Sequence, residues 1–140
     1  MGYKIFFDVN VLLDYTLQRK SFDEIELLIN NIENGFQKGF ITSATIHTLS
    51  YFLTKEYGIK KTKDILLNLL STFHVIDPPQ EIIKSALHAN FNDIEDALQA
   101  YTAIYHKMDY FLTSDRKLKK ESSTTLPIYT PIEFVKEYIN

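Results

Sequence analysis

The sequence predicts an α/β fold: a three-layer α/β/α sandwich with a central, mostly parallel sheet of four or five strands. Three observations predict it. Short apolar runs alternate with segments of helical periodicity, the runs lack the polar alternation of a half-exposed strand, and no hairpin-type turn pair joins them. With 140 residues, 45% of them hydrophobic, the chain can bury one core, so we expect a single domain over residues 1–140.

The first third of the chain contains one strand and two helices. The apolar run Ile5-Phe6-Phe7 predicts a buried strand over 3–7, and the spacing that follows predicts a helix over 9–17. Ser21, with Glu24 three residues later, is typical of a capping box and predicts the start of a second helix, which Gly35 ends.

The rest of the chain continues the alternation of strands and helices. The patterns predict further strands over 40–42, 74–76, 110–113 and 128–129. They predict helices over 43–56 (closed by Gly58), 61–71, 80–88, 94–107 and from Pro131 to 138.

Composition excludes several kinds of protein. The chain has no cysteine, which rules out disulfides, thiolate zinc sites and cysteine nucleophiles. It has no apolar run near the roughly 18 residues of a membrane helix and no charged-then-apolar leader, so we expect a soluble, cytoplasmic protein without a membrane partner. A net charge of −3 means that contact with nucleic acid must come from local patches or bound metal.

Acidic residues follow two of the predicted strands and open one helix. Asp8 follows the first strand, Asp115 follows "YFLT", and Asp93 and Asp96 open the helix at "NDIED", three residues apart and therefore on one face. Because ligands of an open parallel sheet bind outside the carboxyl ends of its strands, we expect these acids at one rim.

Each acid has an alternative interpretation as a helix cap. Asp8 and Asp93 stand where a helix begins, Asp115 could cap the short turn "RKLKK" (116–120), and Asp96 would favour the positive end of the helix dipole. Capping does not explain why the acids gather, since grouped carboxylates repel one another unless a cation lies between them. Oxygen ligands of this kind suit Mg²⁺ or Mn²⁺, and the chemistry indicated is attack of water on a phosphodiester.

Other titratable residues carry less weight. The four histidines, among them His47, share no ligand spacing. We expect Asp14, Glu24 and Glu26 to be solvated.

The spacing of the acids resembles the PIN domain, the ribonuclease fold of many bacterial toxins of the VapC type. Three blocks carry the resemblance, in order: "FFDVNVLLDY", "NDIEDALQAYTAI" and "DYFLTSDRKL". The sequence departs from the family pattern on the helix after the second strand, where Thr48, with His47 adjacent, stands in place of the usual glutamate.

The resemblance implies a metal-dependent endoribonuclease that cleaves single-stranded RNA, such as the toxin of a type II toxin-antitoxin system. It makes Asp8, Asp96 and Asp115 the catalytic acids, which with Asp93 would hold one or two Mg²⁺ or Mn²⁺ ions. Supporting roles would fall to Asn10, Thr48, Thr113 and Ser114, and RNA backbone contacts to Arg116 and Lys117, with the lysines of "KKTK" (60–63) as a second candidate.

The resemblance also implies protein partners. Members commonly form homodimers and are inhibited by an antitoxin that covers the acidic groove. The stretch "YFLTKEY" (51–57) and the helix from Ser21 could supply such surfaces, although we expect most of their apolar residues in the core.

Three other classes compete with a nuclease. A haloacid-dehalogenase-like phosphatase would need a second acid where Asn10 stands, and a response-regulator receiver would need its phosphoacceptor after the third strand. The stronger rival is a PIN-like domain with weakened or lost catalysis that serves as an RNA- or protein-binding module, because Thr48 brings no charge.

Overall fold

The computed structural model describes residues 2–139, and in this part of the chain it contains one sheet of five strands. The strand order is β3-β2-β1-β4-β5, and every neighbouring pair is parallel. The strands are β1 (Lys4–Phe7), β2 (Lys38–Ile41), β3 (Phe73–Val75), β4 (Tyr110–Leu112) and β5 (Ile128–Tyr129). The predicted α/β/α fold is confirmed.

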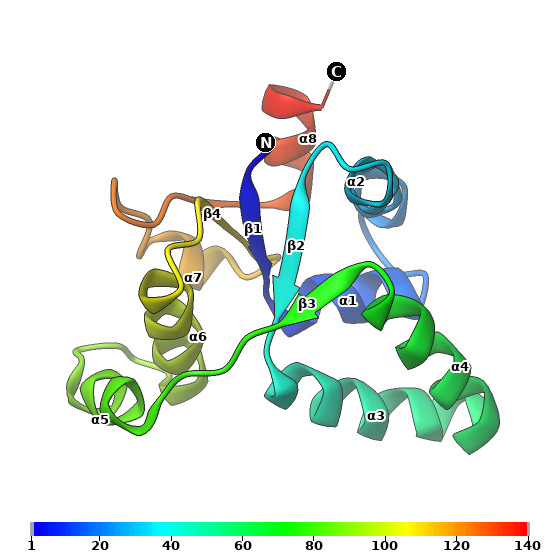
Figure 1. The fold of residues 1–140 in the computed structure, drawn as a ribbon, viewed down its shortest axis with the longest axis horizontal. Coiled ribbons are helices and arrows are strands. Elements are labelled where there is room, and N and C mark those ends of the chain that lie inside the picture. The colour runs from blue at the N-terminus through cyan, green and yellow to red at the C-terminus, as the bar shows by residue number, and fades with distance from the viewer. Residues whose placement is uncertain (1, 140) are drawn as a thin grey trace.

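Helices cover both faces of the sheet (Figure 1). One face carries α1 (Val9–Thr16), α2 (Phe22–Glu33), α3 (Ser43–Tyr57), α4 (Ile59–Leu70) and α8 (Pro131–Tyr138). The other carries α6 (Ile94–Tyr105) and α7 (Arg116–Lys119), with α5 (Gln80–His88) packed against α6. In the described residues, no helix is long and apolar enough to cross a membrane.

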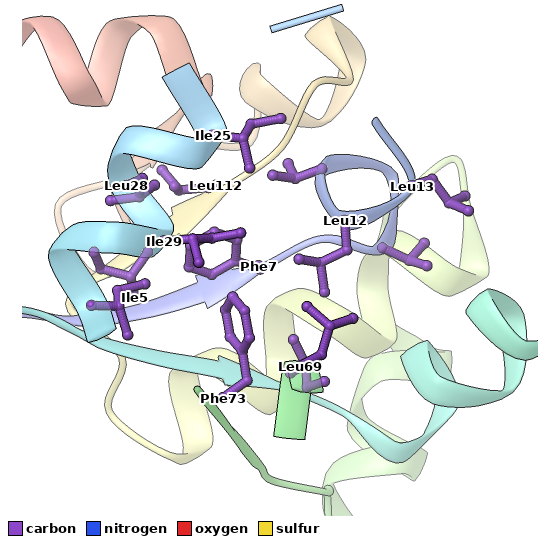
Figure 2. Packing of buried hydrophobic residues seen from close by; sticks show 14 of the residues in the cluster. Ile5, Phe7, Leu12, Leu13, Ile25, Leu28, Ile29, Leu69, Phe73 and Leu112 are labelled. Atoms are coloured by element: carbon purple, nitrogen blue, oxygen red, sulfur yellow. The ribbon is translucent and has the colours of Figure 1, made fainter. Parts of the chain in front are cut away.

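The central strand supplies side chains to both layers of the core. Ile5 and Phe7 point to the larger cluster, and Phe6, between them, points to the smaller one, as the two-residue period of a strand requires. The Phe7 ring packs edge to face on Phe73, with 4.8 Å between ring centroids, under the apolar side chains of α2 (Figure 2). The three buried side chains of β1 therefore hold the strand that directly precedes Asp8.

One helix cap was predicted wrongly and another was missed. Ser21 occupies the N-cap of α2, but its φ of 62° is left-handed and its side chain makes no capping hydrogen bond, so the predicted capping box with Glu24 does not form. A capping side chain normally projects from extended backbone. The capping box of the protein is at α8, where Thr130 and Glu133 bond each other's backbone N–H groups ahead of the predicted Pro131.

The other predicted boundaries differ from the structure by one or two residues. The strand predicted over 40–42 starts at Lys38, because Lys38 and Gly39 pair with Lys4 and Ile5. Gly39 also allows close packing, since a Cβ there would lie 2.7 Å from the Phe73 ring. The helix predicted from residue 61 begins at Ile59, directly after Gly58 with its φ of 84°.

Candidate active site

Asp8 follows β1 directly at the carboxyl edge of the sheet, and only 3% of it is exposed. It stands at the N-cap position of α1, but its side chain makes no capping hydrogen bond, so the capping interpretation is wrong for this residue. Instead, its Oδ2 accepts a hydrogen bond of 2.8 Å from Thr113 Oγ1 and a longer one of 3.5 Å from Asn10 Nδ2. The carboxylate is therefore oriented from β4 and from the first turn of α1.

Thr113 joins the acids that follow the two strands. It is fully buried, and besides donating to Asp8, its Oγ1 accepts a hydrogen bond of 3.0 Å from the backbone N–H of Asp115. Asp115 in turn accepts a hydrogen bond of 2.8 Å at Oδ1 from the Lys117 backbone N–H, which caps α7. One buried hydroxyl thus links Asp8 to the loop that carries Asp115.

The third segment with acids is the start of α6. Asp93 caps this helix, because its Oδ1 accepts a hydrogen bond of 3.0 Å from the Asp96 backbone N–H. Asp96 is half-buried, whereas Asp93 and Glu95 are exposed. For Asp93 and Asp115, the capping role and the position at the rim occur together.

The acids from these segments influence one another electrostatically. Burial raises the pKa of Asp8 from 3.8 to about 6; the hydrogen bond from Thr113 opposes the rise, and the charges of Glu95 and Asp115 add to it. Burial is also the main cause that raises the pKa of Asp96 to about 6, followed by the charges of Asp93, Asp8 and Asp115. Thr113 links Asp8 to the backbone of Asp115 by hydrogen bonds, and burial raises the pKa of both Asp8 and Asp96. That Asp8, Asp96 and Asp115 act together as one site stays a prediction.

Glu95 adds to these electrostatic effects and was not singled out from the sequence. Its charge acts on Asp8 more strongly than that of Asp115 does. In the motif "NDIED", the spacing of three residues selects Asp93 and Asp96, which share a helix face. A sequence signal for Glu95 does exist: Thr48 stands where the family has a glutamate, so another acid is expected to replace that charge.

The donor set suits a hard divalent cation, although the acids are not drawn together tightly. Within residues 2–139, no group of three His, Cys, Asp or Glu side chains is arranged closely enough to hold a metal ion. All the donors of the cluster are carboxylate oxygens, the ligands that Mg²⁺ and Mn²⁺ prefer, and a cation among them would offset both burial and repulsion. The ligand type therefore suits such an ion, whereas in their described positions fewer than three of the acids lie close enough together to share one.

Ser114 and Asp14 form a separate bridge beside the cluster. Ser114 Oγ donates a hydrogen bond of 3.1 Å to Asp14 Oδ2, and Arg19 Nε lies 3.5 Å from Asp14 Oδ1. The expectation that Asp14 is solvated is wrong, since only 13% of its side chain is exposed. Ser114 therefore attaches the loop after β4 to α1 and does not bond Asp8.

The remaining predicted residues lie on α7 and α3. Arg116 and Lys117 are exposed at the start of α7, next to Asp115. Thr48 is half-buried in α3, with His47 exposed beside it. Among the described residues, no hydrogen bond joins Thr48 to the acids.

The surface has two further features, exposed aromatic side chains on α3 and a cavity beside α6. In the stretch "YFLTKEY", Leu53 is buried, but Tyr51 and Phe52 are exposed, so the expectation of a core position is wrong for these two aromatics. A cavity of about 500 Å³ also lies beside α6, and no sequence pattern indicated it. Its lining comes from several segments: Thr42, Ala44, Pro78, Ile83, Ile94, Glu95, Leu98, Gln99 and Thr102.

A sequence model of the PIN domain matches residues 4–117, and the chain belongs to the PIN domain family. The match runs from β1 through the start of α7 and so includes every acid of the cluster. PIN domains are generally nucleases that depend on divalent metal. The predicted family is confirmed.

Two solved structures are similar in fold. One is VapBC2 from Rickettsia felis bound to a DNA fragment from its promoter, with a TM-score of 0.62 and 19% identity over 91% of this chain and 98% of that one. The other is PAE2754 from Pyrobaculum aerophilum, with a TM-score of 0.67 and 22% identity over 98% of this chain and 97% of that one. No curated protein matches the chain.

Proposed function

We propose that this chain is a metal-dependent endoribonuclease and the toxin of a type II toxin-antitoxin pair. The observation that carries the proposal is the position of buried Asp8 at the carboxyl edge of the sheet, where Thr113 hydrogen-bonds both its carboxylate and the backbone of Asp115. Burial also raises the pKa of Asp8 and Asp96, so both carboxylates are costly to keep ionised. Membership of the PIN domain family supports the reaction class. We also propose that residues 1–140 form one domain.

Asp8, Asp96 and Asp115, with Asp93 at the edge, would hold Mg²⁺ or Mn²⁺. When bound, such an ion supplies charge stabilisation for the phosphodiester and lowers the pKa of a water molecule. Thr113 and Asn10 orient Asp8 toward this role. The exposed Arg116 and Lys117 stand next to Asp115, where they can contact the RNA backbone.

Glu95 compensates in this proposal for the glutamate that Thr48 replaces. Its carboxylate acts on Asp8 through charge and comes from α6, not from α3. Thr48 keeps a supporting role through its hydroxyl group. The cluster would therefore retain four or five acids, although it lacks the one that the family places on α3.

An antitoxin is the proposed protein partner. The similar Rickettsia felis structure contains VapBC2, a complex of this type by its name. In this chain, α3 and α4 carry exposed apolar side chains that suit a protein contact: Tyr51, Phe52, Ile59, Leu67 and Leu70. A homodimer stays a prediction.

A cleavage assay tests the proposed reaction. We expect a fluorophore-labelled single-stranded RNA of mixed sequence to be cut by the wild-type chain in Mn²⁺ or Mg²⁺ and to stay intact with EDTA. Asp8→Asn and Asp96→Asn should each lower the rate at least about 100-fold, since each removes a charge at the reacting centre. Cutting that survives in both variants would contradict the assignment of the acids.

A non-catalytic binding module is the second candidate, and the observation that favours it is the uncharged Thr48. On that account, the wild-type chain binds the same RNA without cutting it at any divalent-ion concentration. Restoring an acid by Thr48→Glu would then be expected to produce metal-dependent cutting.

A further inference from the structure

The cavity beside α6 has the size and character of a ligand site. Its volume of about 500 Å³ lies within the range of small-molecule sites, roughly 300–1,000 Å³. The walls are mainly apolar, from Pro78, Ile83, Ile94 and Leu98, with a few polar groups among them. This mixture is typical of sites that take a flat, largely apolar molecule with a polar edge.

A buried polar group in the lining lacks a partner. Gln99 is only 5% exposed, and its Oε1 is buried without a hydrogen bond, unlike most buried side-chain oxygens. Leaving such an oxygen unpaired is unfavourable, and a ligand N–H reaches it once the carboxamide rotates toward the cavity that Gln99 lines. The lining therefore suits a ligand with a hydrogen-bond donor on its edge.

Hydrogen bonds hold the walls of the cavity in place. Asp77 Oδ1 accepts hydrogen bonds from Ser43 N at 3.0 Å and Ser43 Oγ at 2.9 Å, which fix the segment before α5 to the start of α3. His106 Nε2, at the end of α6, lies 2.9 Å from the Asp77 carbonyl oxygen. The cavity is thus formed before any ligand arrives.

The cavity adjoins the acid cluster through α6. Glu95 lines the cavity, and the next residue, Asp96, belongs to the cluster. Gln99 is three residues after Asp96, which places it one turn along the same helix, roughly 4.5 Å by the helical rise. A phosphate at the acids would leave its nucleoside within reach of Gln99.

We infer that this cavity binds one base of the RNA strand next to the scissile phosphate, with Gln99 reading an N–H group on the base edge. The inference rests on the proposed function and adds to it a residue that sets sequence preference. A base offers apolar faces to Ile94 and Leu98 and donors on its edge to the carboxamide.

Other occupants fit the lining less well. The cavity is lined by no lysine or arginine, and its one charged residue is Glu95, so a phosphate group has no partner there. An apolar side chain of a protein partner would fill the walls but leave Gln99 Oε1 unpaired.

An NMR titration of the ¹⁵N-labelled full-length chain tests the inference without requiring cleavage. The probes are AMP, CMP, GMP and UMP, with ribose 5-phosphate as a control that lacks a base and isobutyl acetate, which has no N–H, as a mimic of an apolar protein side chain. We expect the Gln99 side-chain amide signal to shift and saturate with at least one nucleotide. Gln99→Leu, which keeps the size of the side chain, should lower the affinity of the chain for that nucleotide about tenfold.

The matched control is Gln80→Leu, an exposed position on α5 outside the cavity lining, which should leave nucleotide binding unchanged. Three results would overturn the inference: no shift at Gln99 with any nucleotide, the same shifts with ribose 5-phosphate, or a response to isobutyl acetate alone. The cleavage assay stays independent of this readout. RNA cutting without a Gln99 response refutes the base site alone, and a Gln99 response without cutting refutes the nuclease alone.

Discussion

Asp8 combines two unfavourable conditions for an ionised carboxylate, burial and neighbouring acids, with one favourable condition, the hydrogen bond from Thr113. A folded protein keeps such a group only where its charge is used, because an amide of the same shape would avoid the cost. This residue therefore carries the strongest sign of function in the chain.

The first prediction concerns Asp8→Asn in the absence of divalent ions. The pKa of Asp8 is raised from 3.8 to about 6 in the folded state, so folding favours the protonated form. The resulting gain in the free energy of unfolding is complete below pH 3.8 and is lost as the pH rises through 6. The difference between the two pKa values corresponds to roughly 3 kcal/mol of unfolding free energy. We expect the variant to be more stable than the wild type at pH 8, by up to that amount, and nearly equal at pH 4.

Urea unfolding at the two pH values, with EDTA present, gives the comparison. An equal difference in unfolding free energy at pH 4 and pH 8 would contradict the cost assigned to the Asp8 charge.

The second prediction concerns Thr113→Val, which keeps the shape but removes the hydroxyl that bonds Asp8 and Asp115. We expect a loss of about 1–3 kcal/mol in unfolding free energy at pH 8, since hydrogen bonds to charged groups are the stronger ones. The loss should be smaller at pH 4, where Asp8 is protonated. Thr113→Ser is the control, and equal losses in the two variants would point to packing instead of the hydroxyl.

At the scale of elements, the helix caps differ from what their sequences suggest. Ser21 precedes α2 and Thr130 precedes α8, each with a glutamate three residues later, yet only Thr130 forms the capping box. The difference lies in the backbone, which is left-handed at Ser21 and extended at Thr130.

The third prediction uses these two caps as a matched pair. Thr130→Ala should lower the unfolding free energy by about 1 kcal/mol, the usual value of a lost cap. Ser21→Ala should change it by less than about 0.5 kcal/mol, because no capping bond is removed. Thermal unfolding of both variants measures the two effects, and a larger loss at Ser21 would contradict the assignment of the caps.

The predicted elements show where sequence patterns succeed. Apolar patterns located the five strands, and every described helix except α7, to within one or two residues, because burial determines which positions are apolar. They could not find the left-handed Ser21, since the φ angle there depends on how the turn after α1 meets α2. The start of β2 at Lys38 and Gly39 was missed because pairing with β1, and not their own character, makes them a strand.

At the scale of the whole molecule, the topology brings the acids together. The order β3-β2-β1-β4-β5 makes β1 and β4 neighbours, so the Asp8 carboxylate and the Asp115 backbone, far apart in sequence, both hydrogen-bond to Thr113. The sequence pattern placed both acids after strands at one edge of a parallel sheet. Their joint use as metal ligands stays a prediction. The pattern could not predict the Ser114–Asp14 bridge, the influence of Glu95 on Asp8 or the cavity at Gln99, since each depends on side-chain directions or on walls from several segments.

The central claim is that acids from β1, α6 and β4 form one divalent-cation centre. Calorimetric titration of the purified wild-type chain with Mn²⁺ tests it most directly, alongside Asp8→Asn, Asp96→Asn and the control Asp64→Asn on exposed α4. We predict binding by the wild type and the control and a loss of about tenfold or more in affinity in the two site variants. Equal Mn²⁺ affinity in all four proteins, or no binding by the wild type at millimolar Mn²⁺, would contradict the claim.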